Sequence, residues 1–503
     1  MEHVSLVEKS IGMKVLLACP NDSELAASFS KKGGVSIPLG LAYLGAYVQD
    51  IPGIELAGLD NNALKLEPEK YREIIAREAP DIVAISVMTA TVFTTWEMAR
   101  VVKDINPRAI IVVGGGHCSA LPESTFEEPA IDYGVVGEGE EAFRELLMAL
   151  LEKRDPSRIP NLIYRHDGKV HVNPRRSPIR DIDKIPFPKR DLFDNSKYNM
   201  NVNRRATSGK NTTLLTSRGC PYGCIFCSKS IYGHHFNQRS PKNVIEEIKA
   251  LENEGYSEIL IVDDTFTVHK KWVLEFCGLF SELQLKMRWN CHARVNTLDE
   301  ETVSAMKRAH CTGMAFGIES GNPEMLKKID KRITLDQARE AVRLCRKYGI
   351  STLCSYIFGH PGDTRQTMND TLRVALELDS DYANFCVLVP MPGSKIFDDL
   401  MKKENVEKRW DRYLAHSKSP MANSLCEISQ SELQTIQKSA FRRFYFRPKY
   451  IWRKLLAIKN PAALWNLIKG AYIVLLFQIQ AVSRKNRGET GSRDAGKSDH
   501  GAE

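Results

Sequence analysis

Three cysteines lie close together in the segment SRGCPYGCIFCSK, with three residues between the first two and two residues between the second and third. Thiolates are common protein ligands of zinc and of iron–sulfur clusters. A structural zinc site takes four protein ligands, and no fourth cysteine follows at zinc spacing, although His234 and His235 do. The spacing of Cys220, Cys224 and Cys227 favours a 4Fe-4S cluster with one open iron, and zinc is the alternative.

The cysteine segment directly follows the first of six apolar runs that alternate with helical patterns. The runs predict strands at residues 212–217, 258–264, 288–295, 313–320, 351–359 and 382–390. The patterns between and after them predict helices at 241–254, 269–284, 299–309, 335–348, 364–378 and 394–403. Six such units predict a partial (βα)6 barrel, whose chemistry lies at the C-terminal ends of its strands.

The first 150 residues contain five further apolar runs, each followed by a helical pattern or a glycine-rich segment. The predicted strands are 13–18, 55–60, 81–87, 109–116 and 132–137, and the predicted helices are 39–49, 68–78, 91–105 and 138–152. This alternation predicts an open, doubly wound parallel sheet, which binds ligands beyond the carboxyl ends of its strands. The segments GGGH and GEGE end two of these strands and are therefore candidate binding loops.

A different pattern separates the two predicted domains. The segment NLIYRHDGKVHVN predicts a hairpin that turns at Asp167-Gly168, and the proline-spaced IDKIPFPKRDLF suits an ordered linker. The expected domains are therefore 13–152, a hairpin and linker at 153–205, a barrel at 206–403 and a helical region at 404–483. The Gly-, Ser- and charge-rich end at 484–503 is expected to be disordered.

Composition excludes several classes of protein. Among 503 residues, 43% are hydrophobic and 26% charged, which argues against wholesale disorder and against a polytopic membrane protein. Twelve cysteines are too dilute for a disulfide scaffold, and the first twenty residues have no signal-peptide pattern, so we expect a reduced, cytoplasmic protein. The net charge is +8, but residues 438–487 contain twelve Lys and Arg and no Asp or Glu. One basic segment carries the excess, which argues against a nucleic-acid-binding surface on the core.

The cysteine segment resembles the radical S-adenosylmethionine (SAM) superfamily, whose signature Cys-x3-Cys-x-aromatic-Cys is met by the three cysteines and Phe226. The resemblance implies that the cysteines hold a 4Fe-4S cluster and that one electron cleaves SAM to a 5′-deoxyadenosyl radical. It also implies SAM contacts at the ends of barrel strands. The residues concerned are Phe226 near the adenine, Asp263 and Asp264 in VDDTF, Arg294 in CHARV, and Glu319 and Ser320 in GIESG. For Glu319, an alternative is a carboxylate that caps the helix after it.

A doubly wound sheet placed before such a barrel resembles the cobalamin-dependent subclass, which includes the anaerobic magnesium-protoporphyrin monomethyl ester cyclase and many methyltransferases. The resemblance implies a cobalamin-binding sheet, a partial (βα)6 radical SAM barrel and a helical C-terminal extension. It places cobalamin at Gly114, Gly115, Gly116, His117, Gly137 and Gly139. The Asp-x-His-x-x-Gly motif of one cobalamin-binding pattern is absent, and a flavodoxin-like sheet without a cofactor would show the same strand pattern.

The resemblance implies a methyltransferase that acts on an unactivated carbon through methylcobalamin and the 5′-deoxyadenosyl radical. An oxidative cyclase or rearrangement enzyme acting on a tetrapyrrole or a lipid-like substrate is the second possibility. A non-catalytic cobalamin sensor or carrier is the third, and the intact cysteine triplet argues against it. An electron donor such as flavodoxin or ferredoxin is implied as a partner, together with a small-molecule or lipid-like substrate.

The basic C-terminal region interleaves aromatic residues with Lys and Arg and ends in an apolar run. The run at 470–482 is too short to span about 30 Å of hydrocarbon, which needs about 20 apolar residues. Residues 441–482 therefore suit a peripheral contact with an anionic membrane at its inner face, and packing across the open side of the barrel is the alternative.

Overall fold

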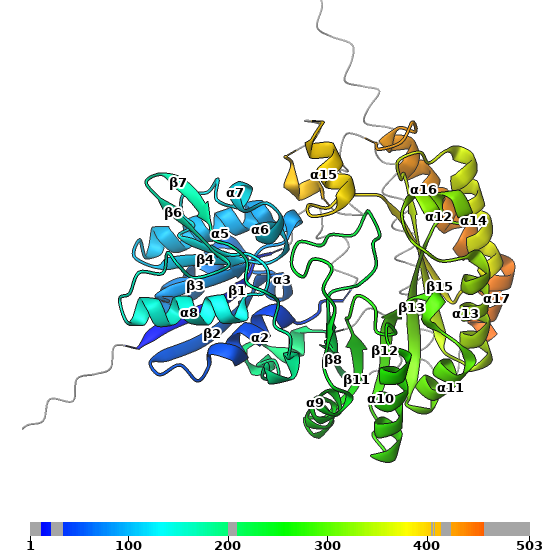
Figure 1. Cartoon of the computed structure of the whole chain (residues 1–503), viewed down its shortest axis with the longest axis horizontal. Coiled ribbons are helices and arrows are strands. Elements are labelled where there is room, and N and C mark those ends of the chain that lie inside the picture. Colours follow the sequence, from blue (N-terminus) through cyan, green and yellow to red (C-terminus); the bar gives the residue numbers. More distant parts are fainter. Residues whose placement is uncertain are drawn as a thin grey trace, which may run out of the picture. The chain divides into compact units, whose positions relative to one another are not determined.

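The computed structural model describes residues 12–21, 34–199, 209–403, 406, 408–413 and 424–456. Contacts divide the chain into two compact units, residues 1–430 and 431–503. The first unit contains two large, mainly parallel sheets, each with its own helices (Figure 1). The disordered tail predicted at 484–503 and the apolar run at 470–482 lie outside the described residues.

The first sheet has the strand order β2-β1-β3-β4-β5-β6-β7. Its strands are β1 (Met13–Cys19), β2 (Ile54–Asp60), β3 (Ile82–Ser86), β4 (Ile110–Gly114), β5 (Tyr133–Val135), β6 (Leu162–His166) and β7 (Lys169–Val172). The first five pair in parallel, and β6 and β7 form the predicted antiparallel hairpin at the edge. The five predicted strands and the hairpin are thus confirmed.

Helices cover both faces of this sheet, as a doubly wound fold requires. Helices α2 (Leu39–Val48) and α8 (Glu140–Leu151) contribute to one hydrophobic cluster, and α4 (Pro68–Glu78) and α5 (Val92–Ile105) to another. Three short helices that the sequence pattern did not predict follow β2 and β4: α3 (Asn61–Leu64), α6 (Gly116–Ala120) and α7 (Pro122–Thr125).

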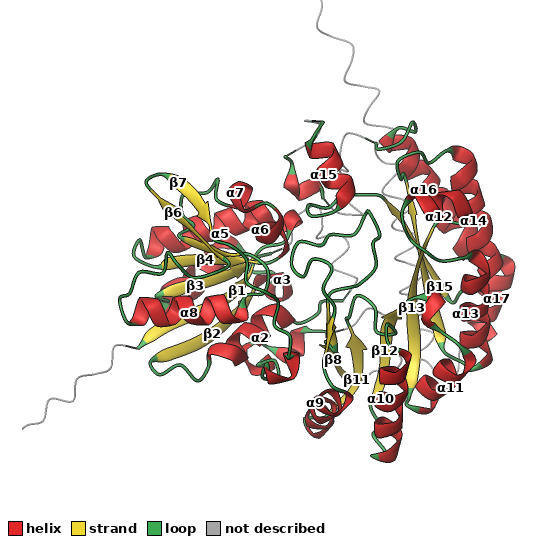
Figure 2. Cartoon of the chain, in the orientation of Figure 1, coloured by secondary structure: helices red, strands yellow, loops and turns green. Residues whose placement is uncertain are grey.

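The second sheet is parallel throughout and keeps the order of the chain, β8-β11-β12-β13-β14-β15. Its strands are β8 (Lys210–Leu214), β11 (Tyr256–Ile261), β12 (Arg288–Ala293), β13 (Cys311–Glu319), β14 (Ser351–Phe358) and β15 (Tyr382–Val387). Figure 2 shows this sheet curled, with helices along its outer side. Because β8 and β15 are its two edges, the predicted partial (βα)6 barrel is confirmed.

The barrel helices, except α10 (Lys270–Glu282), begin at a residue whose side chain caps the helix. The other barrel helices are α9 (Pro241–Asn253), α11 (Glu300–Arg308), α12 (Pro323–Lys328), α13 (Leu335–Lys347), α14 (Arg365–Leu378) and α15 (Lys395–Met401). Ser240 and Asp299 cap α9 and α11, and Thr334 and Thr364 form capping boxes at α13 and α14. Each cap accepts a hydrogen bond from a backbone N–H that the helix cannot satisfy itself, which fixes where each loop ends.

A buried ion triad attaches the linker to the barrel. Arg190, in the 3-10 helix η3 (Arg190–Leu192), donates to one carboxylate oxygen of Glu247 at 2.7 Å. Arg239 approaches the other oxygen at 2.5 Å, and the Glu247 side chain is only 1% exposed. Two cations thus share one carboxylate in a place that water does not reach. The remaining linker turns are η2 (Ile182–Lys184) and η4 (Asn195–Lys197).

The second unit begins in α16 (Gln430–Tyr445) and continues with α17 (Pro448–Leu456). Four apolar residues of α17 are exposed, among them Trp452 at 65% and Leu456 at 70%. Among the described residues, no helix is long and apolar enough to cross a membrane. Of the helical region predicted at 404–483, the structure describes α-helices within residues 430–456.

Replacing Glu247 with Gln should destabilise the first unit strongly, because Arg190 and Arg239 would share a buried site without a countercharge. We expect a loss of about 3 kcal/mol in the free energy of unfolding, measured by urea denaturation. The matched control is E246Q, since Glu246 pairs with Lys249 at the surface and should contribute less than about 0.5 kcal/mol. Equal effects of the two substitutions would contradict the structural role of the triad.

Candidate active site

The cysteine loop, residues 219–236, is closed at its base by backbone pairing. It leaves the short strand β9 (Ser217–Arg218) and returns through β10 (Asn237–Gln238), and the two strands pair in antiparallel fashion. Gly219 starts the loop with a φ of +79°, and a Cβ at this position would clash with the carbonyl oxygen of His235. Glycine is therefore required where the loop begins.

The buried carboxylate of Asp263 fixes the residues that lead into the cysteine loop. Asp263 follows β11 and is fully buried, and it accepts hydrogen bonds from the backbone N–H of Thr216 and the hydroxyl of Ser217, each at 2.7 Å. The hydroxyl of Thr216 also donates to it. Desolvation raises the pKa of Asp263, although these hydrogen bonds oppose the shift. Its SAM contact stays a prediction, as does that of the neighbouring exposed Asp264.

The three cysteines of the loop differ in exposure: Cys224 is buried, Cys220 half-buried and Cys227 exposed. The ammonium group of Lys229 donates to the carbonyl oxygen of Cys220 at 2.8 Å. Among the described residues, no three His, Cys, Asp or Glu side chains come close enough to share one metal ion. A cubane cluster binds each thiolate to a different iron, so its three cysteines need not meet at one metal ion. The donor set therefore fits the cluster.

Arg294 lies beside the buried cysteine and is itself buried. Its Nη1 is 3.8 Å from Sγ of Cys224, and its guanidinium carbon lies 3.7 Å from the centre of the Tyr222 ring. Its other nitrogens donate to the carbonyl oxygen of Lys331 and to the side chain of Asn296. The sequence suggested that Arg294 binds the SAM carboxylate, which stays a prediction. In the structure its nitrogens contact the cysteine loop and two neighbouring loops.

Glu319 ends β13 at an irregular step in the strand pairing and has a φ of +69°. Such irregularities redirect a side chain, and here the Glu319 carboxylate accepts a hydrogen bond from Nζ of Lys331 at 2.8 Å. Both side chains are less than 10% exposed. A Cβ at Gly317 would clash with both groups, so this glycine leaves space for the pair.

The Glu319–Lys331 pair lies next to the aromatic residue of the cysteine motif. Nζ of Lys331 is 5.9 Å from the centre of the Phe226 ring, and the ring of His360 lies 5.4 Å from it. His360 is fully buried, and neither of its nitrogens has a hydrogen-bond partner among the described residues. Burial, followed by the charge of Lys331, lowers the pKa of His360 to about 4, so it is neutral at pH 7. A neutral imidazole offers a polar ligand one donor and one acceptor.

The capping alternative for Glu319 is wrong, because Asn322 caps the following helix. Its side chain accepts from the backbone N–H of Glu324 and of Met325. Ser320 is buried, and its hydroxyl oxygen accepts from the N–H of Asn322 at 3.2 Å. Lys331 and His360 were not among the predicted site residues. The only signal for His360 is its place in FGHPGDT, directly after a predicted strand.

Two glycines at the carboxyl edge of the first sheet adopt backbone conformations that other residues rarely take. Gly115 has a φ of +110°, and a Cβ there would lie 2.9 Å from the carbonyl oxygen of Val87. Gly137 has a φ of +74°. Met88 follows β3, is 55% exposed and lies beside Gly116. This exposed thioether, which the sequence pattern did not predict, and the glycines around it fit the edge of a flat, partly apolar ligand such as a corrin.

His117 is buried near this edge and is held by protein groups. Its Nδ1 lies 3.3 Å from the hydroxyl of Thr89, and its ring packs at 5.1 Å against Trp410. Its Nε2 has no partner among the described residues, and burial lowers the pKa of His117 to about 4. Gly114 ends β4 and Gly139 precedes α8. Cobalamin contacts at these three positions stay predictions.

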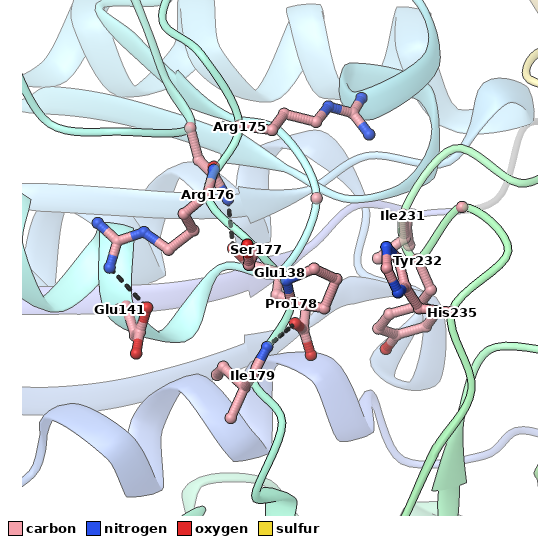
Figure 3. Close-up of a pocket in the computed structure, with 13 residues that line it drawn as sticks. Glu138, Glu141, Arg175, Arg176, Ser177, Pro178, Ile179, Ile231, Tyr232 and His235 are labelled. Atoms are coloured by element: carbon pink, nitrogen blue, oxygen red, sulfur yellow. Dashed lines mark hydrogen bonds and ion pairs between the residues drawn. The ribbon is translucent and has the colours of Figure 1, made fainter.

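A pocket of about 210 Å³ lies where the GEGE segment, the linker and the cysteine loop meet (Figure 3). Glu138 accepts from the backbone N–H of Ile179 in its lining, and Arg176 forms an ion pair with Glu141 at 2.6 Å. Tyr232 and His235 line it from the cysteine loop. The pocket shows that the two predicted binding regions adjoin.

Comparison with known families gives two matches that agree with the two sheets. Residues 214–375 match the Radical SAM superfamily, and residues 29–147 match the B12 binding domain. The first match covers the barrel from β8 into α14, and the second covers the doubly wound sheet from before α2 into α8.

Individual relatives extend this similarity over both domains. An uncharacterized methyltransferase of Pyrococcus horikoshii is 35% identical over 443 residues, which cover 87% of this chain and 94% of that protein. The anaerobic magnesium-protoporphyrin IX monomethyl ester cyclase of Rubrivivax gelatinosus is 28% identical over 448 residues. The alignment covers 87% of this chain and 78% of the cyclase.

Among solved structures, the radical S-adenosylmethionine methyltransferase TsrM from Kitasatospora setae shares the fold, with a TM-score of 0.65, 22% identity and 78% of each chain covered. The two domain matches make a 4Fe-4S cluster, SAM and cobalamin the cofactors of this chain. Because its sequence follows a methyltransferase of this architecture along nearly the whole chain, the protein belongs to the family of cobalamin-dependent radical SAM methyltransferases.

Proposed function

We propose that this enzyme methylates an unactivated carbon of a small-molecule or lipid-like substrate. The observation that carries the proposal is the junction of the cysteine loop with the glycine-rich edge of the cobalamin domain, around the pocket of Figure 3. When bound, the cluster supplies the electron that cleaves SAM, and cobalamin carries the methyl group. We propose that the cobalamin domain comprises residues 13–152 and that the radical SAM domain comprises residues 206–403.

In the net reaction, the substrate carbon loses a hydrogen atom and gains a methyl group. One SAM supplies the methyl group and leaves as S-adenosylhomocysteine, and a second is converted to methionine and 5′-deoxyadenosine, which takes up the hydrogen atom. Two electrons are needed, and a flavodoxin or ferredoxin is the proposed donor. Cyclisation or rearrangement remains the second candidate, because the Rubrivivax gelatinosus cyclase aligns over both domains.

We assign four side chains of the barrel to SAM. Phe226 would pack against the adenine, and the neutral His360 beside it would exchange hydrogen bonds with a polar group of the same ligand. Glu319 and Lys331 present opposite charges a few ångströms away, which suits a ligand with both an ammonium and a carboxylate group. Arg294 and Lys229 hold the cysteine loop and place positive charge next to the cysteines.

We further propose a peripheral membrane contact through residues 441–482. The support is the exposed apolar face of α17, formed by Ile451, Trp452, Leu455 and Leu456, next to the basic residues Lys449 and Arg453. Tryptophan and basic side chains together suit the interface of an anionic membrane. Such a contact would suit a substrate that dissolves in lipid.

The substitution E319Q should weaken SAM binding about tenfold, which corresponds to about 1.4 kcal/mol, because it removes the negative charge that we assign to the SAM ammonium group. Isothermal titration of the reconstituted enzyme with SAM measures the effect. The control E324Q changes an exposed glutamate that pairs with Lys327 and should leave the affinity unchanged. Unaltered SAM binding and cleavage in folded E319Q would exclude a role of Glu319 in the SAM site.

Anaerobic incubation of the reconstituted enzyme with SAM and a reductant should yield both 5′-deoxyadenosine and S-adenosylhomocysteine, quantified by chromatography and mass spectrometry. A cyclase would release the first product without the second, so the absence of S-adenosylhomocysteine would contradict methyl transfer. C224A should abolish deoxyadenosine formation because one iron loses its protein ligand. The control C277A replaces a buried cysteine of α10 and should keep both products.

The double substitution of Trp452 and Leu456 with Glu should reduce flotation of the full chain with anionic liposomes at low salt, because it places charge on the apolar face of α17. Flotation of the unaltered chain should also fall at high salt, which screens the basic residues. The control L283E adds a charge at another exposed leucine, outside α17. Equal recovery of all variants in the soluble fraction would rule out the membrane contact.

A further inference from the structure

Arg218 ends β9, two residues before the first cysteine, yet its side chain lies among residues of the cobalamin domain. Nη1 donates to Glu138 at 2.7 Å and Nη2 to Glu140 at 2.5 Å. Its guanidinium also lies 5.5 Å from the centre of the Tyr43 ring, in α2. The side chain is only 6% exposed. One arginine from the barrel thus connects the base of the cysteine loop to two segments of the other domain.

Glu138 extends this connection to the linker. One of its carboxylate oxygens faces Arg218, and the other accepts from the backbone N–H of Ile179 at 2.7 Å. The carbonyl oxygen of Ile179 in turn accepts from the side chain of Asn237 in β10 at 2.7 Å. Both strands at the base of the cysteine loop are therefore hydrogen-bonded to the same junction.

Arg175 makes a second, independent bridge across the same junction. One of its terminal nitrogens donates to the carbonyl oxygen of Ser230, in the cysteine loop, at 2.7 Å. The other donates to the carbonyl oxygen of Ser119, in α6 of the cobalamin domain, at 2.5 Å. The two arginines bridge the domains at separate points, which restricts rotation as well as separation of the two domains.

We propose that Arg218 is a positioning residue that keeps the cobalamin edge in register with the cluster loop. This inference rests on the proposed function, because methyl transfer from SAM requires the two cofactor sites to keep a fixed separation and orientation. Reductive cleavage of SAM needs the barrel alone. Loss of the Arg218 contacts should therefore slow methyl transfer more than it slows reductive cleavage of SAM.

The first readout is the hydrogen exchange of the chain without cofactors. In R218Q, two buried carboxylates lose their cation, and amides of residues 219–236 and 137–141 should exchange at least fivefold faster by mass spectrometry. The control R339Q removes an arginine that also has two carboxylate partners, Glu377 and Asp336, but on exposed barrel helices. It should leave both segments unchanged. Unchanged exchange of these segments in R218Q would overturn the proposal.

The second readout compares the two products of SAM in the reconstituted enzyme. R218Q should form S-adenosylhomocysteine at least tenfold more slowly, while 5′-deoxyadenosine formation changes less than twofold. R218K can reach only one carboxylate and should recover part of the loss. A parallel fall of both products would show that Arg218 only supports the cysteine loop, and would overturn the proposal.

Two further outcomes separate this proposal from the proposed function. If the unaltered enzyme forms no S-adenosylhomocysteine, the methyl-transfer function fails, and hydrogen exchange still decides whether Arg218 couples the domains. If R218Q does not fold, E140Q tests the same contact from the cobalamin side. Unchanged exchange and an unchanged product ratio in E140Q would then overturn the positioning role.

Discussion

The hydrogen bonds of the buried Asp263 carboxylate fix the direction in which the chain leaves the first barrel strand. The residues that they hold, Thr216 and Ser217, lead directly into the cysteine loop, so the places of all three thiols depend on them. A carboxylate without these donors would be costly to bury, and the donors without the carboxylate would be unsatisfied. These hydrogen bonds therefore favour one conformation of the segment. Arg218, next to Ser217, then contacts Glu138, and Arg294 contacts Cys224 in the cysteine loop.

Both sheets and their longer helices could be predicted because buried parallel strands and capped helices leave periodic, local signals. The strands β9 and β10 have two residues each, too few for any periodicity, and they depend on contacts between segments far apart in the chain. The same reason decides which site residues could be predicted. The spacing of the cysteines is visible in the sequence, whereas Lys331 approaches Glu319 only after the barrel has formed. The glycine-rich loops were found from the sequence, but their contacts with residues of the barrel and linker were not.

The polar groups around the site are arranged as buried ion pairs, which are poor sources of stability. Dehydrating two charges costs about as much as their attraction returns, so apolar residues could often replace them without loss of stability. What such pairs add is geometry, since a wrong arrangement leaves a charge without a partner. The contacts of Arg218 with Glu138 and of Lys331 with Glu319 therefore select one arrangement of loops over compact alternatives.

The space above Gly317 has a consequence for how this protein can vary. A Cβ there meets the carboxylate of Glu319 and the ammonium of Lys331, so a substitution at 317 requires the ends of these two side chains to move. Replacing only Glu319 or only Lys331 leaves the other charge buried without a partner, so each of these single substitutions is also unfavourable. The three positions are thermodynamically coupled. A substitution at position 317 should therefore be tolerated best when positions 319 and 331 change with it.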